Sequence, residues 1–535
     1  MRSLRELYLD GVNISSPSSE WCETTSLSLP KLSVLSMSNC DLSGHFPAEF
    51  FLLPKMQRID ISGNSRLMGQ LPEFPINNSL EVLSLRYTNF SGKLPESISN
   101  LKLLRVLILS KLGLNFNSSS GSIPASVANL SNLMELDLSH NNFNGSIPPF
   151  HRSGVPNLAS LDLSWNHLSG SIPSSLFTFS TLQTLSLGYN NFSDYQLKLD
   201  SSSIPDFGGA TLLSTLQLND NKLEGKLPRS LANCTSLKIL NLGNNTLHDT
   251  FPLWLGKLPR LMVLILRANR FYGPIKHLEN NFPALDVLDI TSNKFFGKLS
   301  IEFFQAIHKL RSLKINGNNL EGKLPKSLAN CRNLEVLDLG KNMIHDTFPY
   351  WLVKLPLLKV LILRSNRFYG SIKFSGDGNA FPMLHILDLA SNNFSALGSL
   401  TELESLDLSQ NSLSRKIPLQ LTSLTFLGVL NLSYNQLDGS ISQRYQFGTF
   451  LNDSYIGNTR LCGVPLTKKC NEVGSQMLPQ KEGEDSWIDG LSIWKVVLMG
   501  YGCGLVIVFS IGYTVLNEFG NKWIASFIRK WKRSR

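Results

Sequence analysis

One short leucine pattern recurs along most of this chain. Residues 158–173 read LASLDLSWNHLSGSIP, which is the pattern LxxLxLxxNxLxGxIP, and similar units return about every 24 residues from Leu4 to Leu437. The eighteen units, of which the first is degenerate, begin at Leu4, Leu32, Met56, Leu80, Leu104, Leu133, Leu158, Leu182, Leu213, Leu237, Leu261, Leu285, Leu310, Leu334, Leu358, Leu384, Leu403 and Leu427. So regular a period favours a stack of similar small units over a fold with one central core.

The period and the pattern are those of leucine-rich repeats, in which each unit supplies one short strand and a return turn. Within LxxLxL, alternation places the leucines on one face of the strand and the x positions on the other. Stacked units bury their leucines together. We therefore predict an α/β-type solenoid with short parallel strands on its concave face and 3-10 or irregular structure on its convex side. Such a surface suits broad recognition better than catalysis.

The asparagine of each unit stands where the chain leaves the strand. Its side-chain amide can pair with backbone groups that the turn would otherwise bury without a partner. We therefore predict a structural role for the asparagines of this ladder, which include Asn141, Asn166, Asn221, Asn245, Asn293 and Asn411. In the Gly-x-Ile-Pro that follows, glycine permits a tight turn and proline fixes an extended segment.

The net charge of +10 first suggests nucleic acid as a partner, but its location argues against this. Residues 517–535 contain six basic residues and one glutamate, so that half of the excess charge lies in the last nineteen residues. Only 17% of the chain is charged. We do not expect a nucleic-acid-binding face on the solenoid.

The seven cysteines predict one disulfide and several buried thiols. Cys462 and Cys470 follow the last unit and are predicted to form a disulfide that closes the exposed end of the core. Cys234 and Cys331 occupy the same unit position and are expected to be separate buried thiols. Cys40 replaces a ladder asparagine, and its pairing with Cys22 stays open. The remaining cysteine, Cys503, lies in an apolar segment, and the spacing does not match zinc ligands.

Asn-x-Ser/Thr acceptors and the disulfide fit a secreted, glycosylated ectodomain. The twelve glycosylation candidates are Asn13, Asn77, Asn89, Asn117, Asn129, Asn144, Asn191, Asn233, Asn244, Asn393, Asn431 and Asn452.

Residues 496–516 carry no charge and are long enough to cross a hydrocarbon core of about 30 Å. An acidic linker, 472–495, precedes them and the basic tail, 517–535, follows, so the positive-inside rule places the tail in the cytoplasm and the units outside. Gly500 and Gly504 have the GxxxG spacing that permits close approach of another membrane helix. The tail is too short for a kinase domain. We predict a single-pass protein of the plasma membrane with domains 1–437 (repeats), 438–471 (C-terminal cap), linker, span and tail.

Several segments together resemble the plant leucine-rich-repeat receptor-like proteins. They are the LDLSxNxLSGxIP units, LESLDLSQN at 403–411, and QFGTF, SYIGN and LCGVPL between 446 and 466, followed by the acidic linker, span and short basic tail. The resemblance covers essentially the whole chain. It implies a kinase-lacking cell-surface receptor in plant defence or development. It also implies an adaptor receptor-like kinase bound through the transmembrane helix, a co-receptor kinase of the SERK type, and a peptide, protein or oligosaccharide as extracellular ligand.

The sequence departs from the family pattern in two places. It begins inside a unit, without a signal peptide or a cysteine-bearing cap, and the unit from Leu384 to Leu403 has only nineteen residues where the family usually carries an island. We therefore expect a member truncated at its N-terminus and lacking the island. Separately, a block of four units is duplicated with an offset of 97 residues, as 213–309 and 310–397.

Outward positions on the strands are where ligand specificity is expected. Arg267 and Arg364 are matched by the duplication, and with Lys314 they are candidates for a cationic stripe that binds a carboxylate; the alternative is ordinary solvated side chains. The aspartates of the Leu-Asp-Leu motifs are expected to be structural, since no enclosing cleft pairs them as catalytic carboxylates. We predict no catalytic residue, metal ligand or cofactor.

The sequence thus predicts a non-enzymatic receptor that signals through partner kinases. Two other interpretations remain: an inhibitor of cell-wall-degrading enzymes, and a non-functional or decoy receptor fragment. The ligand is not identified by the sequence.

Overall fold

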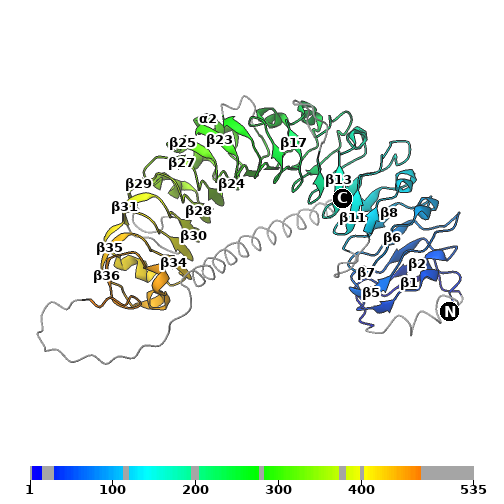
Figure 1. The fold of residues 1–535 in the computed structure, drawn as a ribbon, viewed down its shortest axis with the longest axis horizontal. Coiled ribbons are helices and arrows are strands. Elements are labelled where there is room, and N and C mark those ends of the chain that lie inside the picture. The colour runs from blue at the N-terminus through cyan, green and yellow to red at the C-terminus, as the bar shows by residue number, and fades with distance from the viewer. Residues whose placement is uncertain are drawn as a thin grey trace, which may run out of the picture. The chain divides into compact units, whose positions relative to one another are not determined.

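The leucine units each contribute one three-residue strand to a single parallel sheet (Figure 1). The computed structural model describes residues 3–14, 29–111, 120–193, 204–275, 282–372, 381–397 and 403–470. Within these ranges eighteen strands form this sheet, as the eighteen units predict: β1 (Glu6–Tyr8), β2 (Val34–Ser36), β4 (Arg58–Asp60), β6 (Val82–Ser84), β8 (Val106–Ile108), β10 (Glu135–Asp137), β12 (Ser160–Asp162), β14 (Thr184–Ser186), β16 (Thr215–Gln217), β18 (Ile239–Asn241), β20 (Val263–Ile265), β22 (Val287–Asp289), β24 (Ser312–Lys314), β26 (Val336–Asp338), β28 (Val360–Ile362), β30 (Ile386–Asp388), β32 (Ser405–Asp407) and β34 (Val429–Asn431).

Neighbouring strands pair in register, so each position of a unit lies beside the same position of the next. Leu136 pairs with Leu161 and Leu161 with Leu185, and all three are fully buried. Because the side chains alternate, the first and third residues of each strand point to the opposite, solvent-facing side. The predicted solenoid of parallel strands is confirmed, and the outward residues form its concave face.

The structure adds a second row of short parallel strands, which the sequence interpretation missed. They follow the ladder asparagine, where the Leu-x-Gly segment was expected to make only a turn. These strands are β3 (Ser43–His45), β5 (Arg66–Gly69), β7 (Asn89–Phe90), β9 (Ser120–Ser122), β11 (Asn142–Gly145), β13 (His167–Gly170), β15 (Asn191–Phe192), β17 (Glu224–Gly225), β19 (Thr246–Leu247), β21 (Tyr272–Pro274), β23 (Lys294–Lys298), β25 (Asn319–Gly322), β27 (Met343–Ile344), β29 (Tyr369–Ile372), β31 (Asn393–Leu397), β33 (Ser414–Lys416), β35 (Gln436–Ser440) and β36 (Arg460–Cys462).

Short 3-10 helices return the chain from the second row to the next unit, as expected for the convex side. Most begin directly after the proline of the unit, because proline fixes the extended backbone that precedes the helical turn. The helices are η1 (Ala48–Leu52), η2 (Glu96–Asn100), η3 (Ala125–Asn129), η4 (Ser174–Thr178), η5 (Arg229–Asn233), η6 (Leu253–Lys257), η7 (Lys326–Asn330), η8 (Tyr350–Lys354), η9 (Leu419–Ser423), η10 (Tyr445–Thr449) and η11 (Asn452–Ser454), and the described residues also include the α-helix α2 (Ile301–Ala306).

The ladder asparagine joins successive units, as predicted. In Asn166, Nδ2 donates to the carbonyl oxygens of Leu138 (2.9 Å) and Leu163 (3.1 Å), while Oδ1 accepts from the backbone N–H of Phe143 (3.0 Å). One buried amide therefore pairs with backbone groups of two units. The same arrangement recurs at Asn245, Asn293 and Asn411.

The residue before each ladder position has a left-handed backbone. Its φ is positive in all eighteen units, for example +56° at Trp165 and +55° at Tyr189. This turn lets the asparagine side chain fold back under the strand. Residues other than glycine, asparagine and aspartate disfavour such a backbone. Because one residue of each unit nevertheless adopts it, the stacking of the units imposes this conformation along one edge of the sheet.

The nineteen-residue unit does not interrupt the sheet. β30 pairs in register with β32, and Asn411 accepts from the N–H of Phe394 as in other units. Only residues 398–402 separate β31 from Leu403, whereas residues 417–426, which include η9, separate β33 from Leu427. The shortening thus falls on the return segment and leaves the strand intact.

After the last strand, the segment up to Cys470 continues the ladder. Leu432 N–H donates to Ser454 O (2.7 Å), and β36 pairs with β35, with Tyr455 and Leu461 fully buried. Cys462 and Cys470 form a disulfide. The predicted linker, span and tail, with Gly500 and Gly504, lie outside the described residues. Within the ranges that are described, no helix is long and apolar enough to cross a membrane.

Candidate ligand-binding surface

Aspartates at the third strand position shape the concave face. Asp162 Oδ1 accepts hydrogen bonds from the backbone N–H (2.9 Å) and the hydroxyl (2.6 Å) of Ser164, and Asp137 binds Ser139 in the same way (3.0 and 2.6 Å). These bonds hold the strand exit in place. Burial raises the pKa of Asp162. The Leu-Asp-Leu-Ser motif therefore acts structurally here.

The predicted cationic stripe does not form a continuous patch. Arg267 follows β20 and Arg364 follows β28, which lies four strands further along the sheet and therefore about 19 Å away. Lys314 lies in β24, between Asp289 on one neighbouring strand and Asp338 on the other. All three cations share the concave side, but carboxylates lie between them.

Arg364 is already paired. Its guanidinium lies 3.4 Å from the carboxylate of Asp388 on the next strand. Burial, with the neighbouring carboxylate of Asp407, raises the pKa of Asp388 to about 6. Of the two matched arginines, the second is therefore partly neutralised within the protein, and a ligand would have to compete with Asp388 for it.

A stack of rings, here called the aromatic row, runs along one edge of the concave face. It consists of His140, Trp165 and Tyr189, which are the left-handed residues of three successive units. The rings of His140 and Trp165 are 5.2 Å apart and nearly parallel, and those of Trp165 and Tyr189 are 3.6 Å apart at 13°. Trp165 is nonetheless 43% exposed. The row therefore presents ring edges to solvent, while both faces of Trp165 are covered.

A cationic group continues this row toward the N-terminus. Lys111 Nζ donates a hydrogen bond to the Tyr87 hydroxyl (2.9 Å) and lies 4.7 Å from its ring centre, and the Arg86 guanidinium lies 5.1 Å from the same ring. The hydrogen bond from Lys111 lowers the pKa of Tyr87. Burial, with Lys111 nearby, lowers the pKa of His140. At neutral pH the aromatic row is thus uncharged next to two cations.

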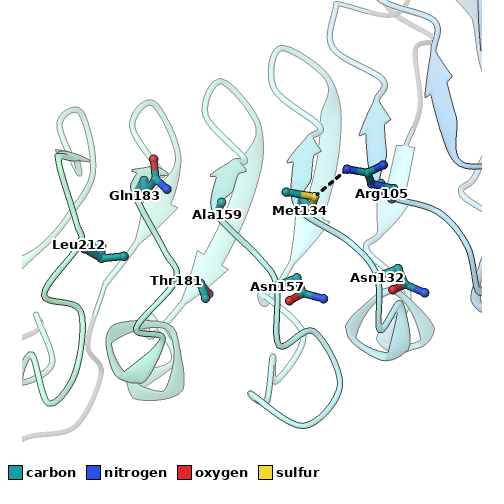
Figure 2. Close-up of a pocket in the computed structure, with 8 residues that line it drawn as sticks. All are labelled: Arg105, Asn132, Met134, Asn157, Ala159, Thr181, Gln183 and Leu212. Atoms are coloured by element: carbon teal, nitrogen blue, oxygen red, sulfur yellow. Dashed lines mark hydrogen bonds between the residues drawn. The ribbon is translucent and has the colours of Figure 1, made fainter. Parts of the chain in front are cut away.

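A groove of about 460 Å³ runs along the other edge of the same strands (Figure 2). Figure 2 shows its walls as two lines of side chains, one residue of each line per unit. Its apolar lining residues are Met134 and Leu212, which are exposed, and Ala159, whose small side chain leaves space near the middle; Leu212 lies at one end of the groove. One line is Arg105, Met134, Ala159 and Gln183, and the other is Asn132, Asn157, Thr181 and Leu212.

Hydrogen bonds within the wall fix the polar side chains of the groove. Asn132 Nδ2 donates to the carbonyl oxygen of Lys102 (2.8 Å), and Thr181 Oγ1 donates to that of Leu158 (2.8 Å). Arg105 contacts Met134 Sδ at 3.6 Å. Because the groove and the aromatic row belong to the same successive units, the strands β8 to β14 carry both, one at each end.

The sequence interpretation missed this surface. The residues of the aromatic row are not adjacent in the sequence, and only their shared position directly before the ladder asparagine signals that they stack. Those of the groove share two positions at the start of each unit.

The glycosylation candidates fall mostly outside the concave strands. Asn144, Asn191 and Asn393 lie in the second row of strands, and Asn129 and Asn233 end 3-10 helices. Asn431, in β34, and Asn244, which donates to Asp220 (2.7 Å), lie on the concave side of later units. Asn117 lies outside the described residues. Glycosylation remains a prediction.

Among the described cysteines other than Cys462 and Cys470, Cys234 and Cys331 are free and buried, as expected; Cys40 is buried, as expected, and carries no disulfide to another described residue. Burial raises the pKa of both Cys234 and Cys331 to about 12. Cys22 lies outside the described residues, so its pairing is not settled. In the described part of the chain, no group of three or more His, Cys, Asp or Glu side chains could hold a metal ion.

Known proteins share both the pattern and the fold. Leucine-rich-repeat families match residues 108–168, 283–344 and 309–368, and in single units 31–53, 79–101, 212–234, 236–258 and 402–424. Receptor-like protein 35 of Arabidopsis thaliana is 51% identical over 85 residues, which are 16% of this chain and 9% of that protein. These matches support a plant leucine-rich-repeat receptor-like protein.

Two solved ectodomains resemble this receptor-like protein in structure. The plant peptide hormone receptor RGFR1, in complex with RGF2, has a TM-score of 0.67 at 31% identity, covering 78% of this chain and 65% of that one. The Arabidopsis receptor kinase HAESA, in complex with the peptide hormone IDA and the co-receptor SERK1, has a TM-score of 0.58 at 28% identity, covering 88% and 76%. The sequence match to the curated relative spans less than a tenth of its length.

Proposed function

We propose that this protein is a cell-surface receptor that binds an extracellular ligand with its concave face and signals through partner receptor kinases, in plant defence or development. The observation that carries the proposal is the long, in-register concave sheet with its rows of outward side chains, in a chain similar to the plant receptor-like proteins. A continuous open surface of this kind suits an elongated ligand better than a small substrate.

The proposed partners follow from the family and from two solved neighbours. Both neighbours were solved with peptide hormones, and one also with the co-receptor SERK1. For this chain we propose a co-receptor kinase of the SERK type, and an adaptor receptor-like kinase that associates with the span 496–516 through Gly500 and Gly504.

The test is co-precipitation of the full chain from plant membranes with the adaptor kinase. The Gly500→Leu/Gly504→Leu variant should recover at least several-fold less kinase, because leucine side chains prevent close approach of the two helices. The control variant, Gly502→Leu/Gly512→Leu, changes two other glycines of the same predicted helix. Gly502 falls on the opposite face, since two residues turn a helix by about 200°. Equal recovery with both variants would exclude the GxxxG contact.

The receptor proposal itself requires surface exposure. Protease treatment of intact cells should remove the repeats and protect an epitope placed on the tail. Recovery of the mature protein only as a soluble extracellular form would instead favour the inhibitor of cell-wall-degrading enzymes, and absence of any surface protein would favour a decoy or non-functional fragment.

The Arg267, Lys314 and Arg364 set remains a candidate ligand contact. A ligand that binds Arg364 would have to break the ion pair between Arg364 and Asp388.

A further inference from the structure

Within the described part of the chain, three cations on neighbouring units form no ion pair with a carboxylate. They are Arg86, Arg105 and Lys111. On later strands of the same face, Arg364 is paired with Asp388, whereas Arg267 and Lys314 also form no ion pair within the described residues, so the three cations are set apart by their position beside the groove and the aromatic row. Unpaired cations at both edges of one stretch of sheet attract a ligand that carries carboxylates.

Between the two edges the sheet is low and polar at β12 and β14, whereas β8 carries Val106 and Ile108 outward. The outward residues after β10 are small over the next strands: Ser160 and Ser164 on either side of Asp162, then Thr184, Ser186 and Gly188. Short side chains let an extended backbone approach the sheet between the groove and the aromatic row. An extended chain rises about 3.3 Å per residue, so a peptide of seven or eight residues spans about five units.

The aromatic row favours a peptide over a glycan. Sugars stack on open aromatic faces, but both faces of Trp165 are covered by His140 and Tyr189. What the surface offers instead are ring edges, side-chain amides, and the exposed apolar side chains of Met134 and Leu212 in the groove. These groups suit the side chains and backbone of a peptide.

This stretch also lacks predicted glycosylation acceptors. None of the twelve candidates lies in the strands β6, β8, β10, β12, β14 and β16 of the large sheet or at the left-handed position that follows each of them; Asn89, Asn144 and Asn191 lie in the second row of strands. Asn244 and Asn431, in contrast, place acceptors on the concave side of later units. A glycan would therefore not cover the surface between the groove and the aromatic row.

The geometry points to a binding site for an extended acidic peptide on β6 to β16, with its carboxylates against Arg86, Arg105 and Lys111 and its apolar side chains in the groove beside Met134 and Ala159. This assignment rests on the proposed ligand-binding role and specifies its ligand class and location. The site lies between the aromatic row and the groove, and Trp165 forms part of its rim.

The test measures peptide capture by the purified full chain. The probes are two pools of random peptides about twelve residues long, enough to span the site. They are identical except that fixed glutamates in one pool are glutamines in the other. An oligogalacturonide serves as a carboxylate-bearing glycan. We expect the glutamate pool to be retained at least tenfold better than the glutamine pool, and better than the glycan.

Two charge-matched triple variants locate the site. Arg86→Gln/Arg105→Gln/Lys111→Gln should reduce the retention ratio to near one. The control, Lys238→Gln/Arg260→Gln/Lys341→Gln, removes three positive charges from later units and should leave the ratio unchanged; Lys238 and Lys341 occupy the unit positions of Arg105 and Lys111, and Arg260 is exposed. Ala159→Glu, which places a carboxylate in the groove, should lower retention at least severalfold while the far-ultraviolet circular dichroism stays that of the wild type.

Three results would overturn the site: unchanged retention in the first triple variant, equal loss in the control, or stronger capture of the oligogalacturonide. The site and the receptor proposal can fail independently of each other. If peptide capture depends on the three cations but the protein is absent from the cell surface, the receptor proposal fails and the site stands. If the protein is at the surface and recovers its kinase, but no peptide is captured, the site fails alone.

Discussion

The indole ring of Trp165 lies 3.6 Å from the phenol ring of Tyr189, with 13° between their planes. The two residues are one unit apart and occupy the same position in it. Neighbouring strands lie about 4.8 Å apart, which is close to the distance at which aromatic rings stack. The solenoid spacing therefore turns aromatic residues at equivalent positions into a stack without any other specific arrangement.

Replacing Trp165 with alanine should remove both ring contacts of the stack. Each such contact contributes about 1 kcal/mol, so we expect the free energy of unfolding to fall by about 2 kcal/mol in urea titrations. Tyr434→Ala changes an aromatic residue that is 57% exposed at the same unit position and should cost less. An equal loss in both variants would mean that the stack adds no stability.

Asn166→Ala should be more costly, because several backbone groups of two units would lose their partner. Unpaired buried polar groups cost about 1–3 kcal/mol each, so we expect a loss of about 3 kcal/mol or more. Asn157→Ala, which removes an exposed amide with one long hydrogen bond of 3.4 Å, is the control. Similar unfolding midpoints for the two variants would contradict the structural role of the ladder.

The pH dependence of stability should carry a component from Asp388. Its native pKa of about 6 exceeds the ordinary value of 3.8, so the folded protein holds this proton more tightly than the unfolded chain. The contribution of the protonated carboxyl to the free energy of unfolding is therefore fully present below about pH 4. It is lost as the pH rises through about 6, and the loss amounts to about 3 kcal/mol.

Asp388→Asn removes this component. The variant should gain stability relative to wild type between about pH 4 and pH 7, which urea titrations at several pH values would reveal. A stability difference that does not change with pH would show that the carboxyl of Asp388 titrates normally.

The disulfide between Cys462 and Cys470 should protect the C-terminal end of the described units. It closes a short loop, for which the chain-entropy model gives about 2 kcal/mol. Cys462→Ser/Cys470→Ser should speed proteolysis around β36 by about tenfold or more. Reduction should accelerate cleavage of the wild type and leave the variant unaffected; equal rates before and after reduction would argue against the bond.

The thiols of Cys234 and Cys331 should resist alkylation in the native protein. Burial raises the pKa of each to about 12, so thiolate is scarce near pH 8. Peptide mapping after iodoacetamide treatment should find both unmodified until the chain unfolds. Full labelling without denaturant would mean that the convex side opens readily.

Periodicity was enough to predict the large sheet, because the same pattern of buried leucines and alternating strand residues recurs in each unit. Even the shortened unit keeps β30 beside β32, since the pattern that forms the strand is intact. The second row of strands was missed because segments such as His167–Gly170 are short and contain the glycine and serine typical of turns. Their pairing depends on neighbouring units, which local propensity does not report.

The candidate site was less accessible to sequence reasoning. Arg267 and Arg364 attracted attention because the duplication makes them identical, but identity in sequence said nothing about the carboxylate of Asp388 beside one of them. The contact between Lys111 and Tyr87 links residues 24 positions apart. The groove has space at Ala159 because alanine has a small side chain. Such features arise from unit-to-unit juxtaposition and emerge only when the units are stacked.

The left-handed row has a consequence for engineering. A bulky residue with positive φ costs about 1–2 kcal/mol relative to glycine, yet Trp165 and Tyr189 hold this backbone. A consensus version of the protein with glycine or asparagine along this edge would remove this backbone cost, but at Trp165 it would also remove the two ring contacts, which contribute a similar free energy. The stacked rings therefore compensate the disfavoured backbone, and neighbouring units that both carry aromatic residues at this position can differ from the consensus without a net loss of stability.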